Sequence, residues 1–198
     1  MPRLVSLRSL AAALVLAIIL PAGLLAVDDL AAARAGLTRM LERYGERHPK
    51  VIDQRIRVAE LERIPATEPA ALRSARVELA VMLAHYAENH PKLRAQVARV
   101  QAMEEQVKRN PAMPSEILTA RGDLAALGLR YGDGNPRVAA AKVHVAALEK
   151  YLLAPGNESR ELRLARAELD ELTQRYGAGH PKIKEQADRV VALEGAAK

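Results

Sequence analysis

The chain contains no cysteine, phenylalanine or tryptophan, and only five of its 198 residues are tyrosine. Without cysteine it can form no disulfide and offers no thiol for lipid attachment, so the fold must be stable without covalent cross-links. Apolar residues make up 49% of the chain, which is enough for a core. Because alanine and leucine dominate that core, close contacts between helices are favoured over a large cavity.

Motifs that would indicate an enzyme are also missing. The sequence has no nucleophile elbow, no glycine-rich phosphate loop and no metal-binding motif. Recurrent acidic residues occur singly in each repeat and form no convergent acid–base pair. His85 and His144 are isolated and lack the spacing of metal ligands. We therefore predict a protein that is not an enzyme and that uses no cofactor or metal.

What the chain does contain is one phrase repeated four times, in which a tyrosine precedes His or Asn by four residues, Pro by five and Lys or Arg by six. The tyrosines are 42, 45 and 45 residues apart. They are Tyr44, Tyr86, Tyr131 and Tyr176. A fixed period in this range is typical of stacked supersecondary units rather than of a single catalytic domain.

Apolar residues recur at helical spacing on both sides of each phrase. If each tyrosine is position 0, position −7 is Leu and position +14 is Val in all four copies. These residues are Leu37, Leu79, Leu124 and Leu169, and Val58, Val100, Val145 and Val190. With further apolar residues three and four positions away, they predict a helix before the phrase and another after it.

The phrase itself has the residues of a tight turn between two helices. Glycine at +1 ends the first helix with a positive φ, and Ala87 replaces it in the second copy, so that turn is expected to close differently. Proline at +5 suits the first residue of the next helix, and the residue before it suits an N-cap. The cap residues are His48, His90, Asn135 and His180, and the prolines are Pro49, Pro91, Pro136 and Pro181. Asn135 favours capping over a metal-binding role for the recurrent histidines, because asparagine is a poor metal ligand.

If the chain reverses near position +3.5, residues that lie side by side in the two antiparallel helices have position numbers that add up to about seven. The tyrosine then packs in the seam opposite +7 with its hydroxyl in water, although a row of exposed tyrosines for binding is an alternative. Arginine at −10 lies level with glutamate at +18. The predicted ion pairs are Arg34 with Glu62, Arg76 with Glu104, Arg121 with Glu149, and Arg166 with Glu194.

Together these patterns predict an all-α fold of four tandem antiparallel hairpins. The hairpins span about residues 28–64, 69–108, 114–152 and 158–195, and short links with proline join them. Pro69 and Pro114 are expected in the first turn of a helix. Neighbours must stack to bury both apolar faces, as a short α-solenoid or a coiled-coil-like array, in one domain of residues 27–198. Pairing of helices from two chains in a homo-oligomer remains open.

Residues 1–26 follow a different pattern. Arg3 and Arg8 precede an uncharged run from Ser9 to Val27, and acidic residues follow. This is the layout of a bacterial secretory signal, with cleavage expected near Ala22 or Ala26. The alternative is an uncleaved anchor in the inner membrane. The predicted location is periplasmic or secreted, and in either case the repeats lie outside the inner membrane.

The repeated phrase resembles the helical-hairpin segments in the periplasmic regions of bacterial polysaccharide chain-length determinants and exopolysaccharide transport proteins. Their pattern has Leu, then Tyr, then His-Pro and an apolar residue, and Leu37, Tyr44, His48, Pro49 and Val51 match it. The resemblance covers roughly 30 residues of each copy. It implies a setting in the cell envelope and its polysaccharides, and it brings no catalytic residue.

Basic residues gather at the turns. Stacked hairpins would align them along one edge, beside helix N-termini that already attract anions. The candidate anion-binding residues are Arg43, Lys50, Lys92, Arg130, Arg137, Arg175 and Lys182. A solvated rim that keeps the protein soluble is the competing interpretation, and nucleic acid is disfavoured because no Phe or Trp is interleaved for stacking. Two functions follow: a non-catalytic envelope scaffold that binds protein partners, or a direct binder of acidic polysaccharide or lipid headgroups.

Overall fold

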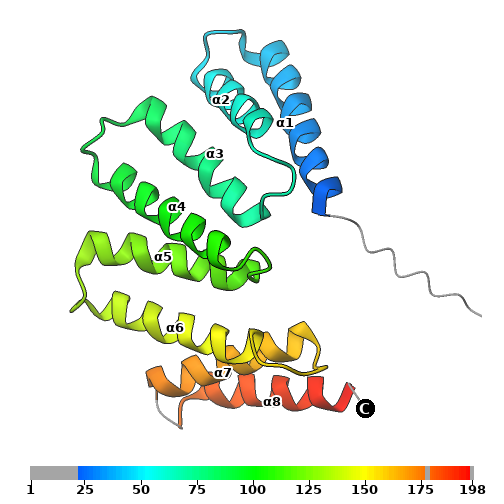
Figure 1. Ribbon diagram of the computed structural model, residues 1–198, viewed down its shortest axis with the longest axis vertical. Coiled ribbons are helices and arrows are strands. Elements are labelled where there is room, and N and C mark those ends of the chain that lie inside the picture. Colours follow the sequence, from blue (N-terminus) through cyan, green and yellow to red (C-terminus); the bar gives the residue numbers. More distant parts are fainter. Residues whose placement is uncertain (1–21, 177–178, 197–198) are drawn as a thin grey trace, which may run out of the picture.

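The computed structural model describes residues 22–176 and 179–196, and this part of the chain is all-α, as predicted (Figure 1). Eight helices and no strand are found in these residues. The helices are α1 (Ala22–Tyr44), α2 (Pro49–Arg63), α3 (Ala70–His85), α4 (Pro91–Arg109), α5 (Ser115–Tyr131), α6 (Pro136–Leu152), α7 (Arg160–Tyr176) and α8 (Pro181–Ala196).

The helices pair into four hairpins, numbered 1 to 4 in chain order, that stack on one another (Figure 1). Each odd-numbered helix also contacts the odd-numbered helix of the next hairpin. Arg73 of α3 forms an ion pair with Asp29 of α1 at 3.5 Å. Arg160 of α7 donates a hydrogen bond to Glu116 of α5 at 3.0 Å. The array is therefore a short α-solenoid.

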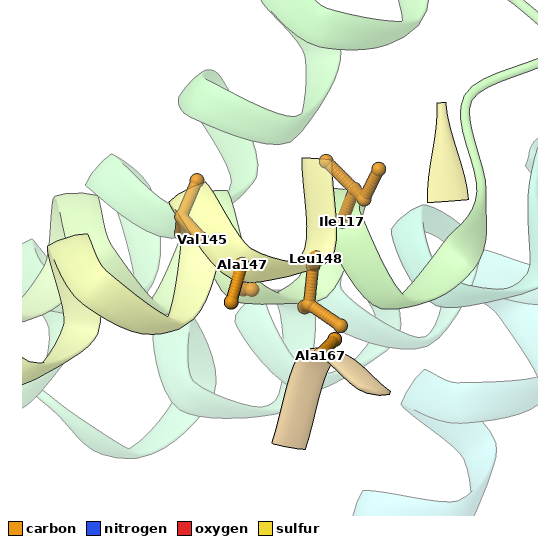
Figure 2. Packing of buried hydrophobic residues seen from close by; sticks show 6 residues of the cluster. Ile117, Val145, Ala147, Leu148 and Ala167 are labelled. Carbon is orange, nitrogen blue, oxygen red and sulfur yellow. The ribbon is translucent and has the colours of Figure 1, made fainter. Parts of the chain in front are cut away.

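The core runs through neighbouring hairpins without interruption. In one cluster Ile117 of α5 and Leu148 of α6 pack against Ala167 of α7, which belongs to the next hairpin (Figure 2). In another, Met103 of α4 packs with Leu118 of α5. All five side chains are at most 5% exposed. A single hairpin would leave these residues in water, so stacking supplies the apolar burial that stabilises the fold.

The turns form as the sequence predicts. Gly45 and Gly132 have φ values of +74° and +76°, a region that residues with a side chain seldom adopt. In the second copy no such residue is available, and α3 instead ends at His85, with Tyr86 in an extended conformation (φ −117°). The substitution by Ala87 is thus absorbed by shortening the helix.

Two helix starts differ from the prediction by one residue. Pro69 and Pro114 are N-caps and not first-turn residues, because their ψ angles of 134° and 138° are extended while their carbonyls already accept the first helical hydrogen bonds. Helix α1 begins at Ala22 and so includes residues on both sides of the boundary expected after residue 26, and cleavage there stays a prediction. Alanine and leucine, both good helix formers, make up residues 22–26 except for Gly23, and they favour this extension of the helix. The rest of the predicted signal, residues 1–21, lies outside the described residues.

The contacts within a hairpin extend beyond the predicted register. Val190 at +14 shares a buried cluster with Leu162 and Ala165, at −14 and −11, and its predicted partner Leu169 at −7 packs against the same cluster. Positions that sum to zero and to three therefore meet in the core, in addition to the predicted pair that sums to seven. Small alanine at −11 permits this close approach, and the long Arg and Glu side chains of the ion pairs span the offset.

A recurrent hydrogen bond that the pattern did not reveal locks this register. Glutamine at +10 donates through Nε2 to the backbone carbonyl of the alanine at −11, over 2.8–2.9 Å. The pairs are Gln54 with Ala33, Gln96 with Ala75, and Gln186 with Ala165. In the third copy Ala141 occupies +10.

Ionisable contacts make the stability of the hairpin 3–4 interface depend on pH. Burial raises the pKa of Glu116, but hydrogen bonds from Arg160 outweigh it and bring the net pKa below 4.5. The hydrogen bond from Lys150 lowers the pKa of Asp170 below 3.8. A carboxyl group with a lowered folded-state pKa stabilises the fold above its unfolded-state pKa, and this contribution is lost as the pH falls through the folded-state value.

Acidification should therefore loosen α7 before α3. Burial raises the pKa of Glu68 in the link before α3, so its protonation removes a cost there instead of adding one. Between about pH 5 and about pH 3 we expect amide-exchange protection to fall earlier in α7. The double variant E116Q/D170N should abolish this difference, and equal loss of protection in both helices of the unmodified chain would contradict the assignment.

Candidate anion-binding edge

The four repeated phrases lie along one edge of the solenoid, which we call the turn edge, and the links between hairpins lie along the opposite edge (Figure 1). At each phrase the +7 side chain is buried, which fixes the start of the second helix. These residues are Val51, Leu93, Val138 and Ile183, with 0%, 2%, 1% and 9% exposure. The basic residue one position earlier is exposed in every copy.

The predicted caps are present at all four turns. His48, His90 and His180 accept a hydrogen bond through Nδ1 from the backbone N–H two residues on, over 3.2–3.3 Å, and Asn135 Oδ1 does the same at 2.9 Å. Because Nδ1 accepts a backbone hydrogen bond, each of these histidines acts as a helix N-cap. Within residues 22–176 and 179–196, no cluster of three acidic, histidine or cysteine side chains is arranged to hold a metal ion.

The tyrosines lie at the turn edge, and two of them, Tyr44 and Tyr176, are exposed instead of packed in the hairpin seam, which corrects the prediction for these two; Tyr86 and Tyr131 are half-buried. Tyr44 and Tyr176 are 37% and 46% exposed. Three of the rings stack on the histidine of the same turn, with ring centres 4.2–4.5 Å apart. The reason is the N-cap, which holds the histidine ring beside the tyrosine and draws the tyrosine toward the surface.

Cations surround the tyrosine rings as well. Arg43 and Lys50 lie 5.3 and 5.6 Å from the centre of the Tyr44 ring. Arg130 and Arg137 lie 5.3 and 5.4 Å from that of Tyr131, whose hydroxyl accepts a hydrogen bond from Arg137. Arg175 lies 5.8 Å from the Tyr176 ring. These contacts hold positive charge in place at three of the four turns.

The turn-edge cations are largely without acidic partners. In the described part of the chain, six of the seven candidates have no carboxylate within 4.0 Å, and Arg175 has only Glu171, at 3.6 Å. The six are Arg43, Lys50, Lys92, Arg130, Arg137 and Lys182. Two acidic residues of the turns pair elsewhere, Glu46 with Arg55 and Asp133 with Lys142. The turn edge therefore keeps most of its positive charge.

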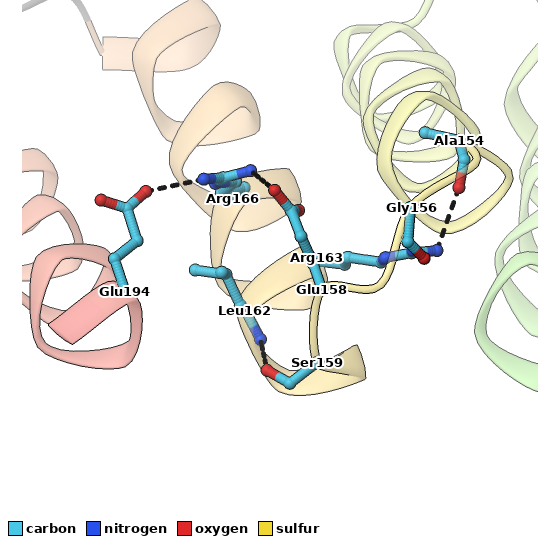
Figure 3. A network of polar contacts seen from close by, with 8 residues as sticks. All are labelled: Ala154, Gly156, Glu158, Ser159, Leu162, Arg163, Arg166 and Glu194. Carbon is cyan, nitrogen blue, oxygen red and sulfur yellow. Dashed lines mark hydrogen bonds and ion pairs between the residues drawn. The ribbon is translucent and has the colours of Figure 1, made fainter. Parts of the chain in front are cut away.

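At the opposite edge, which we call the link edge, the recurrent arginines are paired with carboxylates. All four predicted Arg–Glu pairs form there, at 2.5–2.7 Å. Arg166 lies between Glu194 and Glu158, and Arg163 donates to the carbonyls of Ala154 and Gly156 in the preceding link (Figure 3).

The second carboxylate at the link edge was missed although the sequence carried a signal for it. Glu68 and Glu158 occupy the same repeat position, −18, and each contacts the arginine at −10, at 3.3 and 2.6 Å. In the third copy Met113 stands at this position and packs against the core. The contrast between a neutralised link edge and an unpaired turn edge identifies the turn edge as the candidate anion-binding surface.

No helix in residues 22–176 and 179–196 combines the length and the apolar character that a membrane crossing requires. No known protein family, curated protein or solved structure matches the chain. The resemblance of the repeated phrase to polysaccharide chain-length determinants therefore stays a prediction.

Proposed function

We propose that this chain is a non-catalytic helical-repeat scaffold of the bacterial cell envelope, and that it binds acidic polysaccharide through its turn edge. The observation that carries the proposal is the row of exposed cations without carboxylate partners at all four turns. A cation near a helix N-terminus costs about 0.3–1 kcal/mol, so four such residues at +6 need a reason. An anionic polymer that spans several turns supplies one.

The arrangement at each turn favours recognition by charge. A histidine ring or a cation already lies against each tyrosine ring, so we expect stacking of sugar rings to contribute less than charge. Carboxylate or phosphate groups of a polymer would instead contact Lys or Arg at +6 and at −1, where −1 is basic. Repetition along the edge makes the binding multivalent, so modest contacts at single turns combine into useful affinity.

A scaffold that binds envelope proteins is the second candidate, and exposed apolar residues favour it. Leu83 and Leu129 are 57% and 50% exposed and line one groove beside α4. Binding there would depend on apolar surface and not on ionic strength. Association with the membrane is expected only if the N-terminal segment remains uncleaved.

The proposal is tested by the salt dependence of binding to alginate, an acidic polysaccharide, with neutral dextran as the matched control. We expect alginate binding at low ionic strength to weaken steeply as salt rises, because each neutralised anionic group releases counterions. Dextran should not bind at any salt concentration. Binding of both polymers with no effect of salt would rule out the turn edge as a charge-reading surface.

A further inference from the structure

A groove between the turn-edge ends of α6 and α7 has a volume of about 410 Å³. This volume lies within the usual range for small-molecule sites. Its floor comes from the first turns of α6, including Pro136, Ala139, Ala140 and Val143. These small apolar side chains leave the slot open because no large residue fills it.

Apart from its arginines, the groove has two polar wall residues, Glu171 and Gln174, and each has a partner within the protein; Gln174 donates to Asp170 at 3.3 Å. Glu171 is its one acidic residue, and His144 holds that carboxylate at 2.7 Å while Arg175 lies 3.6 Å away. The negative charge of Glu171 is therefore engaged by His144 and Arg175. A sugar ring would find few hydrogen-bond partners against an alanine and valine floor, and unmatched hydroxyl groups would be costly to bury.

One end of the groove carries two arginines, which outnumber its single glutamate. Arg137 of α6 and Arg175 of α7 both line it, from facing helices. Each guanidinium also lies over the tyrosine of its own turn, at 5.4 and 5.8 Å from the ring centre. The groove therefore combines an apolar slot with two positioned cations at its turn-edge end, which is the polarity of an amphiphilic anion.

We propose that this groove binds a single acyl chain that ends in a carboxylate or phosphate. The chain lies along α6, and Arg137 and Arg175 bind the head group, since guanidinium groups match the geometry of both anions. Pro136 and Val143 are seven residues apart, roughly 10 Å along the helix axis, which is about the length of an extended eight-carbon chain. The inference does not rest on polysaccharide binding, although the two sites share both arginines.

Isothermal titration of the full chain with decanoate and decyl phosphate tests the proposal. Neutral decyl glucoside and inorganic phosphate probe the apolar chain and the anion separately, and both should bind at least about tenfold more weakly than decanoate. Shortening octanoate to hexanoate should weaken binding on the order of tenfold, because two methylene groups leave the slot.

The matched pair A140F and A146F separates the groove from other apolar surface. Ala140 lines the groove, whereas Ala146 lies on the same helix, exposed and outside it. A140F should lose decanoate binding about tenfold or more and keep alginate binding, and A146F should keep both. Any binding of decanoate by the apolar N-terminal sequence is common to both variants and cancels in this comparison.

Equal affinity of A140F and A146F for decanoate would overturn the proposal, as would equal affinity of the unmodified chain for decanoate and decyl glucoside. If circular dichroism shows that A140F does not fold, the variant R137Q/R175Q tests the proposal instead. Both arginine side chains are exposed, so their replacement should not disturb the fold. That variant should lose the preference for decanoate over decyl glucoside, and retention of the preference would contradict the assignment. Loss of alginate binding alone, with decanoate binding intact in the unmodified chain, would refute only the polysaccharide proposal.

Discussion

Replacing Gly122 with alanine should lower the free energy of unfolding by about 1–3 kcal/mol, the range typical of overpacked cores. Gly122 is buried in α5 where hairpin 3 contacts α4 of hairpin 2. A Cβ atom at this position would lie 2.8 Å from Cγ of Met103 and 2.9 Å from Cγ of Arg99. Both atoms are close to their own backbones, so relieving the clash requires the two helices to separate.

Gly128 provides the control because it lies in the same helix with open space around its Cα. No atom lies within 4 Å of a Cβ added there. Gly128→Ala should therefore raise the free energy of unfolding, by about 0.5–1 kcal/mol, since alanine loses less conformational entropy in a helix. Urea denaturation of both variants measures the two effects. The same sign for both would show that close α4–α5 packing does not set the stability of the array.

The turns could be predicted from the sequence because their chemistry is local. A cap residue, a proline and a glycine each act on the backbone within a few residues, so His48, Pro49 and Gly45 have the roles expected of them. The N-cap role of Pro69 was missed because proline also suits the first helical position, and the two differ only in ψ.

The register within hairpins could not be predicted in the same way. It depends on how closely two helices approach, which the size of the residue at −11 decides, and alanine carries a weak signal in a chain so rich in it. The recurrent glutamine at +10 was visible as a repeat, but its partner is a backbone carbonyl such as that of Ala33, which no sequence pattern marks.

For the candidate site, the sequence located the cations but not their partners. The basic residues at −1 and +6 could be read from the repeat. Glu46 pairs with Arg55, and Asp133 pairs with Lys142, which leaves the turn cations without partners. These pairings depend on side-chain directions around each turn. The α6–α7 groove arises only from stacking of hairpin 4 on hairpin 3, because its two arginines are 38 positions apart in the sequence.

The central claim is that the unpaired cations of the turn edge bind an acidic polymer, and neutralising them tests it most directly. The variant K50Q/K92Q/R137Q/K182Q removes the +6 cation from every turn. The control R57Q/R63Q/K108Q/R109Q removes the same charge from exposed positions of α2 and α4 away from the turns. Both variants keep the helix lengths and differ in where the charge is lost.

The measurement is the affinity of each variant for alginate at low salt, determined by titration and compared with that of the unmodified chain. We expect the turn-edge variant to lose on the order of a hundredfold or more in affinity and most of its salt dependence, because each lost contact reduces counterion release. The control should bind within about threefold of the unmodified chain, since exposed charges beyond a Debye length contribute little. Equal losses in the two variants would show that only net charge matters and would contradict a binding site at the turn edge.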